Sequence, residues 1–89
     1  MSKKNVLFKS EEWKARHSTA EFLRELADGL EQGSVTLRRG EQEVDLIIPE
    51  TVEVEIEVTE KVKRHKTEWE LEIEIEWIDA ENGGTVTLG

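Results

Sequence analysis

The sequence predicts an α+β domain in which one helix packs on the apolar face of a twisted antiparallel meander of about five strands. Two runs in the second half, residues 52–58 and 69–77, alternate apolar residues with glutamate, as strands with one buried face do. Residues 18–33 instead repeat apolar positions at helical spacing. The links after this helix are too short for parallel crossovers, so neighbouring strands must be antiparallel. The expected order is β-α-β-β-β-β, with residues 1–89 in a single domain.

The first two expected elements are a strand over residues 5–13 and the helix that follows it. Leu7 and Ser10 interrupt the alternation of that strand. Ser18 and Glu21 match a capping box at the start of the helix, and Gly33 is typical of a helix C-terminus. The apolar stripe between them consists of Phe22, Leu23, Leu26, Ala27 and Leu30.

A hairpin is expected next, over residues 35–46. A two-residue turn at Gly40-Glu41 would align Val35 and Leu37 with Leu46 and Val44. The same register places Arg38 opposite Glu43, a favourable pair on the outer face.

Pro49 has no amide proton to donate, so it should end this hairpin and lead into two long strands over about residues 51–62 and 65–78. A turn at Lys63-Arg64 would align Val58 with Trp69 and Glu57 with Glu70. A register shifted by two residues would keep the same side chains on the same face. Asn82-Gly83-Gly84 predicts a turn, and residues 85–88 a short edge strand.

The long pair places seven glutamates on one face of the sheet: Glu53, Glu55, Glu57, Glu70, Glu72, Glu74 and Glu76. This row is either the solvated face of an exposed sheet or an anionic docking surface for a basic protein. Alternate side chains on a strand lie ~6.6–6.8 Å apart, close to the phosphate spacing of a nucleic-acid strand. Specific binding of a divalent cation is disfavoured, because a flat sheet lacks a loop that wraps carbonyls around the ion.

The apolar face of the expected sheet is larger than one helix can cover. A helix of about fourteen residues is ~21 Å long, whereas strands of about twelve residues run to ~39 Å. We therefore expect Trp69, Trp77 and Trp13 either to fill the ends of the core or to contribute to a homodimer or partner contact.

The net charge of −9 disfavours nucleic-acid phosphates and anionic membranes as partners. The basic tip of the long hairpin, formed by Lys61, Lys63, Arg64 and Lys66 around His65, is the exception and leaves a phosphate contact open. The chain contains no cysteine and starts without a signal peptide or membrane span, so a cytoplasmic protein is expected.

Enzymatic chemistry has little support in this sequence. Only His17 and His65 could serve as neutral bases, and cysteine and tyrosine are absent. The glycines form no phosphate-binding loop, and no residues stand at metal-ligand spacing. We expect no enzyme activity, no cofactor and no metal.

Four segments carry a family resemblance: residues 22–30 (FLRELADGL), 33–37 (GSVTL), 48–50 (IPE) and 70–77 (ELEIEIEW). They resemble the amphi-Trp domain family, small prokaryotic proteins with an amphipathic strand that ends in tryptophan, here Trp77. The resemblance covers about residues 18–77 and implies a free-standing domain without an established activity.

The expected function is therefore a non-enzymatic interaction or accessory domain that presents the acidic sheet face to a basic partner. The alternatives are a nucleic-acid-associated module that uses the basic tip, and an inert structural subunit of a larger complex.

Overall fold

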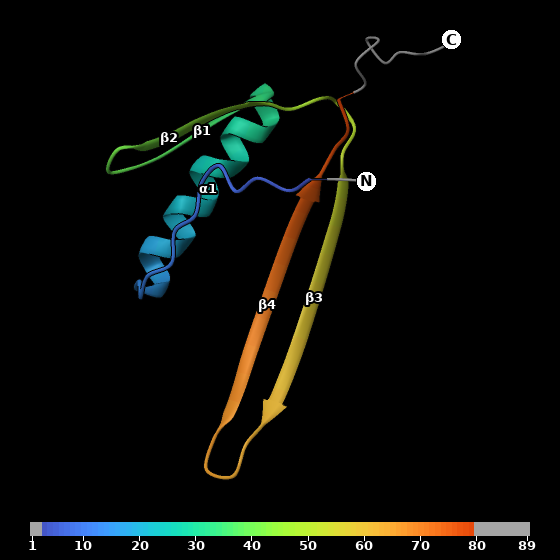
Figure 1. Ribbon diagram of the computed structural model, residues 1–89. Helices are drawn as coiled ribbons and strands as arrows, with labels where there is room; N and C mark the ends of the chain where they lie inside the picture. The colour runs from blue at the N-terminus through green and yellow to red at the C-terminus, as the bar shows by residue number, and fades with distance from the viewer. Residues whose placement is uncertain (1–2, 80–89) are drawn as a thin grey trace. The chain divides into compact units, whose positions relative to one another are not determined.

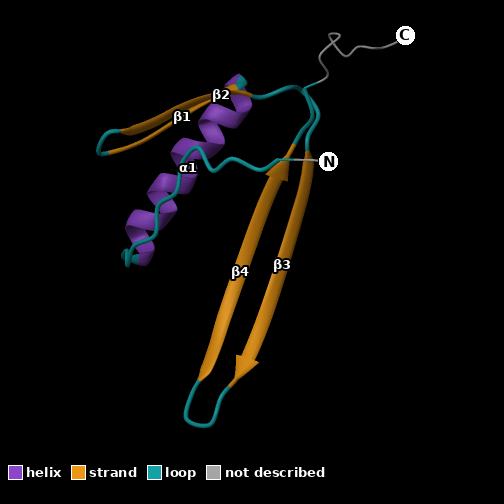
Figure 2. Cartoon of the chain, viewed as in Figure 1, coloured by secondary structure: helices purple, strands orange, loops and turns teal. Residues whose placement is uncertain are grey.

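The computed structural model describes residues 3–79, which contain one helix and four antiparallel strands, so the α+β class is confirmed (Figures 1 and 2). The elements are α1 (Arg16–Gln32), β1 (Ser34–Arg39), β2 (Gln42–Ile47), β3 (Glu53–Val62) and β4 (Thr67–Glu76). The chain divides into two compact units, Met1–Ile48 and Pro49–Gly89. The prediction of a single meander is wrong, because the strands of the described residues form two separate two-stranded sheets, β1–β2 and β3–β4.

The strand expected over residues 5–13 is also wrong. Residues 3–15 form no strand, so the helix is the first element of the described chain. The broken alternation at Leu7 and Ser10 gives this segment no continuous apolar face to bury. Its backbone is hydrogen-bonded to a side chain of β2, since the Lys9 N–H donates to Gln42 Oε1 and the Lys9 carbonyl accepts from Gln42 Nε2, both at 3.4 Å. The edge strand expected at residues 85–88 lies outside the described residues.

Helix α1 begins three residues earlier than a capping box at Ser18 would place it. Ala15 is the N-cap and makes no side-chain cap, so Ser18 and Glu21 lie inside the helix. Glu21 Oε2 lies 3.3 Å from His17 Nε2 one turn back, which uses the carboxylate that a capping box would need. The C-terminal prediction is confirmed. Gly33 adopts φ 89°, and its N–H donates to the carbonyls of Gly29 and Leu30 at 2.8 and 3.2 Å.

Gly29 allows α1 to approach β1 closely. A Cβ at this position would lie 2.7 Å from the Ser34 carbonyl oxygen and 3.0 Å from Val35 Cγ2. The structure shows that a side chain here would collide with backbone.

The β1–β2 hairpin has the expected register, with Val35 opposite Leu46 and Leu37 opposite Val44 across the Gly40-Glu41 turn. On its outer face Arg38 Nη2 lies 3.1 Å from Glu43 Oε2, and this hydrogen bond raises the pKa of Arg38. The core of the described residues consists of Val35 and Ile48, whose exposed fractions are 6% and 9%. Ile48 is fixed by its N–H, which donates to the Gly33 carbonyl at 2.9 Å.

Strands β3 and β4 form one long hairpin whose register differs by two residues from the expected alignment. Val58 lies opposite Leu71, and Glu57 opposite Glu72. The cause is the turn, which is centred on Arg64-His65 and closed by a 2.7 Å hydrogen bond from the Lys63 N–H to the Lys66 carbonyl. Moving the centre of the turn by one residue shifts the pairing by two, so every side chain keeps its expected face.

Helix α1, the one helix of the described residues, is not long and apolar enough to cross a membrane.

Candidate functional site

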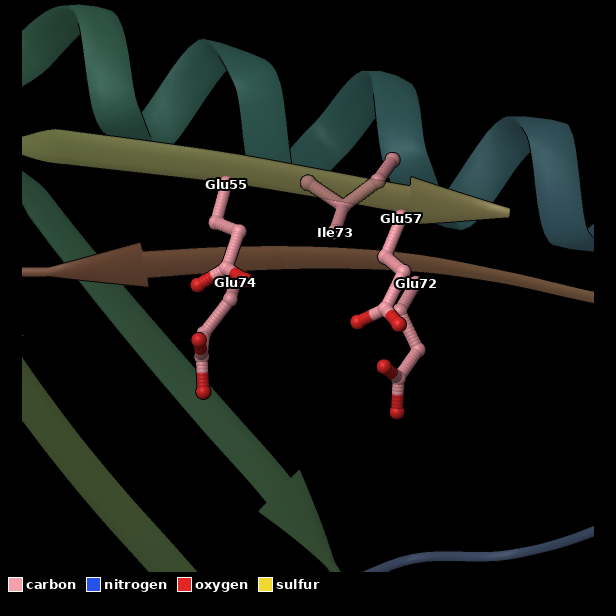
Figure 3. A pocket seen from close by; sticks show the side chains of 5 residues that line it. All are labelled: Glu55, Glu57, Glu72, Ile73 and Glu74. Atoms are coloured by element: carbon pink, nitrogen blue, oxygen red, sulfur yellow. The ribbon is translucent and has the colours of Figure 1, made fainter. Parts of the chain in front are cut away.

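The candidate site is the face of the β3–β4 hairpin that carries the glutamates, called here the glutamate face. Three successive cross-strand pairs on it are glutamate opposite glutamate: Glu53–Glu76, Glu55–Glu74 and Glu57–Glu72. Figure 3 shows the carboxylates of the last two pairs on one side of the strands, with Ile73 on the other. All seven predicted glutamates therefore share one face, and Glu70 completes it opposite Thr59 rather than opposite another glutamate.

Crowding raises the pKa of two carboxyls on this face. The pKa of Glu55 is raised above its ordinary value of 4.5, first by a hydrogen bond with Glu74 and then by the charge of Glu74. The pKa of Glu72 is raised as well, chiefly by the charge of Glu70 and then by partial loss of water around the group. The carboxylates of this face therefore repel one another, and a cation bound near them would reduce this repulsion.

The half of the hairpin near the turn is different, because cations balance its carboxylates. Lys61 lies opposite Glu68, and Glu68 Oε2 lies 3.2 Å from Lys63 Nζ and 3.4 Å from Lys66 Nζ. The Thr59 hydroxyl donates to Glu70 Oε1 at 3.5 Å. Two of the basic-tip lysines are thus already paired with a carboxylate of the same hairpin.

The hollow between the two crowded glutamate pairs is smaller than a site for a drug-sized ligand. The hollow between Glu55, Glu57, Glu72 and Glu74 has a volume of about 150 Å³, whereas pockets for drug-sized ligands usually measure roughly 300–1,000 Å³. Within residues 3–79, no group of three or more His, Cys, Asp or Glu side chains is placed to hold a metal ion.

The opposite side of the hairpin is called here the apolar face, and it carries Val54, Ile56, Val58, Val62, Trp69, Leu71, Ile73 and Ile75. Most of these side chains are more than half exposed, and Trp69 is 68% exposed. Of the other two candidate tryptophans, Trp77 follows β4 directly and is half-buried, whereas Trp13 belongs to the Met1–Ile48 unit and is fully exposed. Trp13 therefore covers no part of the core formed by Val35 and Ile48 in its own unit.

Sequence reasoning missed one charged cluster, in the Met1–Ile48 unit. Glu12 Oε2 lies 3.6 Å from Lys14 Nζ and 3.8 Å from Arg39 Nη1, and Arg39 also donates to Ser10 Oγ at 2.6 Å. These groups border a groove between residues 8–14, α1 and β1. No local pattern in the sequence marks it, because residues 10–14 and 39 are far apart along the chain. Lys14 and Arg39 both lie close to the Glu12 carboxylate. The contacts of Arg39 with Glu12 and Ser10 link the N-terminal segment to β1.

The comparisons with known proteins identify a family but no function. The chain matches the Amphi-Trp domain over residues 1–88, which extends the resemblance seen over residues 18–77 to nearly the whole sequence. No curated protein and no solved structure gave a significant match. The amphipathic strand that ends beside Trp77 is β4, with glutamates on one face and apolar residues on the other. The chain therefore belongs to the amphi-Trp domain family.

Proposed function

We propose that this protein is a non-enzymatic interaction domain that binds a basic protein through the glutamate face of β3 and β4. The observation that carries the proposal is the set of three adjacent glutamate pairs, at Glu53–Glu76, Glu55–Glu74 and Glu57–Glu72. Like charges opposite each other destabilise a sheet. The chain places lysine or threonine opposite the glutamates near the turn, so this arrangement is confined to one half of the hairpin.

The expected partner is a segment rich in lysine or arginine. Its positively charged side chains would lie between the paired carboxylates, and each carboxylate could accept charge-assisted hydrogen bonds from them. Because the face is open and flat, recognition would depend mainly on charge, and the association should weaken as salt rises.

The alternative function, phosphate contact through the basic tip, has less support. Glu68 lies within 3.4 Å of both Lys63 and Lys66, so a phosphate would have to compete with a carboxylate already in place. The net charge of −9 also repels a nucleic acid.

The test is binding of a fluorescent decalysine peptide, followed by anisotropy at low salt. The first variant replaces four residues of the glutamate face: Glu55→Gln, Glu57→Gln, Glu72→Gln and Glu74→Gln. The matched control removes the same charge elsewhere, with Glu21→Gln, Glu25→Gln, Glu31→Gln and Glu41→Gln. We expect the first variant to bind at least about tenfold more weakly and the control to change less than about threefold.

Equal losses in the two variants would contradict the proposal, because net charge alone would then explain the binding. If the peptide result holds, capture from a cell lysate with the same two variants identifies the natural partner. A mobility-shift assay with single-stranded DNA tests the alternative, and a shift lost on Lys63→Gln and Lys66→Gln would favour the basic tip.

A further inference from the structure

The N-terminal segment, residues 3–14, lies on its own unit without forming a helix or a strand. Phe8 is the one partly buried residue of this segment, while Val6, Leu7 and Trp13 are 69%, 69% and 103% exposed. A segment that buries so little apolar surface gains little stability from packing. Its attachment to the unit therefore depends mainly on a few polar contacts.

Two residues beside the β1–β2 turn make these contacts. Arg39, the last residue of β1, donates from Nη1 to Ser10 Oγ at 2.6 Å and lies 3.8 Å from Glu12 Oε2. Gln42, the first residue of β2, uses its side-chain amide to bond both the N–H and the carbonyl of Lys9 at 3.4 Å. All of these contacts are exposed, so each of them contributes little to stability.

The segment closes one side of the groove that it shares with α1 and β1. This groove has a volume of about 860 Å³, and its apolar lining consists of Phe8 from the segment, Phe22 from α1 and Leu37 from β1. Lys14 Nζ lies 5.5 Å from the centre of the Phe22 ring, a cation–π distance, so the segment also contacts the helix. Release of residues 3–14 would remove Phe8 from the groove and leave Phe22 and Leu37 as its apolar lining.

We propose that residues 3–14 are a strap that opens and closes over this groove as one piece, with Arg39 as the residue that holds it closed. The rest of the unit stays folded when the strap is open, because the helix cap at Gly33 and the β1–β2 register involve no strap residue. Arg39 has this role rather than Gln42, because it is charged and contacts two strap side chains. The strap and the glutamate face belong to different units, so this inference does not rest on the proposed function.

Salt should shift the strap toward its open form. Raised ionic strength screens exposed ion pairs, and the pair between Arg39 and Glu12 joins the strap to β1. The hydrogen bonds between Gln42 and Lys9 join neutral groups, so they should change little. We expect the ratio of open to closed strap to rise about twofold between about 0.05 and 1 M NaCl in wild type, and to stay constant in Arg39→Gln.

The first experiment measures how often the strap opens, from tryptic cleavage of the full chain after Lys9. Cleavage of a folded protein requires local opening, so its rate relative to that of the free peptide of residues 3–16 gives the open fraction. Mass spectrometry separates this cleavage from cuts after other residues. Wild type should be cleaved about 10–100 times more slowly than the peptide. Urea well below the unfolding midpoint should change this rate little, because opening of the strap exposes little surface.

Two neighbouring arginines supply a matched pair of variants. Arg39→Gln removes both contacts with the strap and should raise the open-to-closed ratio about threefold to tenfold. Arg38→Gln removes the same charge from the adjacent residue, whose partner Glu43 belongs to the hairpin, and should leave the ratio within about twofold of wild type. The far-UV helix signal of Arg39→Gln should be unchanged, which separates release of the strap from loss of the fold.

Three results of this experiment would overturn the proposal. Cleavage of wild type at the rate of the free peptide would show that the strap is not held closed. Cleavage that follows global unfolding in urea would show that the strap does not open by itself. Equal effects of Arg39→Gln and Arg38→Gln would show that net charge, and not the contact with Ser10 and Glu12, controls the opening.

The second experiment follows the position of the strap directly. The chain contains no cysteine, so Leu7→Cys carries a single spin label on an exposed position of the strap. In the closed form the label should broaden the amide signals of Gly40 and Gln42 at the β1–β2 turn, because Gln42 contacts Lys9. Arg39→Gln should reduce this broadening. Broadening that is absent in wild type, or equal in the two proteins, would overturn the proposal.

Discussion

The two hairpins of residues 3–79 differ in the charges that face each other across their strands. In β1–β2, Arg38 lies opposite Glu43, and the Thr36 hydroxyl donates to Asp45 Oδ1 at 2.7 Å. In β3–β4, three glutamates lie opposite three glutamates. The first hairpin adjoins the buried residues Val35 and Ile48, whereas every residue of β3 is exposed.

This difference indicates where each part of the molecule gains its stability. The Met1–Ile48 unit has a small core, Val35 and Ile48, and favourable pairs on the outer face of its hairpin. The β3–β4 hairpin has neither, so its stability depends on whatever covers the apolar face and on the ions around the glutamate face.

The largest expected effect comes from the small core of the first unit. Ile48→Ala should lower the free energy of unfolding of this unit by about 2–4 kcal/mol, because the side chain is 9% exposed. Ile47→Ala is the matched control, since Ile47 is 76% exposed and should cost less than about 1 kcal/mol. Urea denaturation followed by the helix signal at 222 nm measures both. Equal costs would show that the core lies elsewhere.

The contact between α1 and β1 should be almost as sensitive. Gly29→Ala should destabilise the unit by about 1–3 kcal/mol, although alanine is the better helix former, because the new Cβ would lie 2.7 Å from the Ser34 carbonyl oxygen. Asp28→Ala changes the neighbouring exposed position and should have little effect. The same urea titration decides, and a stabilised Gly29→Ala variant would show that helix propensity outweighs the contact.

Within the long hairpin, one kind of substitution should have opposite effects at two positions. Glu55→Gln removes repulsion from Glu74 and should raise the melting temperature by about 1–5 °C. Glu68→Gln removes the partner of Lys63 and Lys66 and should leave the melting temperature unchanged or lower it slightly. Melting followed at 215 nm measures both variants. A decrease for Glu55→Gln would show that its neighbours do not repel it.

The smallest effect is the dependence of hairpin stability on pH and salt. The raised pKa of Glu55 and Glu72 means that the folded hairpin takes up protons before the unfolded chain does. The repulsion is fully present above the raised pKa, and stability should increase as pH falls from 7 toward the ordinary value of 4.5. Added NaCl at pH 7 should act in the same direction. Amide hydrogen exchange of β3 and β4 is the measurement, and slower exchange at pH 7 than near pH 5, after correction for the intrinsic rate, would contradict it.

Much of the fold followed from local patterns. Alternation located β3 and β4 and assigned each side chain to a face, and Gly33 and the Gly40-Glu41 turn set the end of α1 and the register of β1–β2. The glutamate face could be predicted in full for this reason, since it depends only on a period of two residues.

The errors arose where local patterns compete with longer-range packing. Ser18 and Glu21 match a capping box, yet the helix starts at Arg16, so both residues lie inside it and Glu21 contacts His17 one turn back. Residues 5–13 contain enough apolar side chains to suggest a strand, but their alternation is broken at Leu7 and Ser10, and they form no strand. The division into two sheets was also hidden, since short links permit pairing between β2 and β3 without requiring it.

The glutamates of the long hairpin also bear on aggregation. Two ten-residue strands with β-branched side chains and outer edges open in the β3–β4 sheet would normally act as a template for further strands. In a growing fibre, each added copy would stack its carboxylates on those of the copy before it, at a spacing of ~4.7–4.8 Å. The same repulsion that weakens one hairpin would be repeated at every added layer, so it opposes the growth of such a fibre. Acid that stabilises the single hairpin would remove this limit.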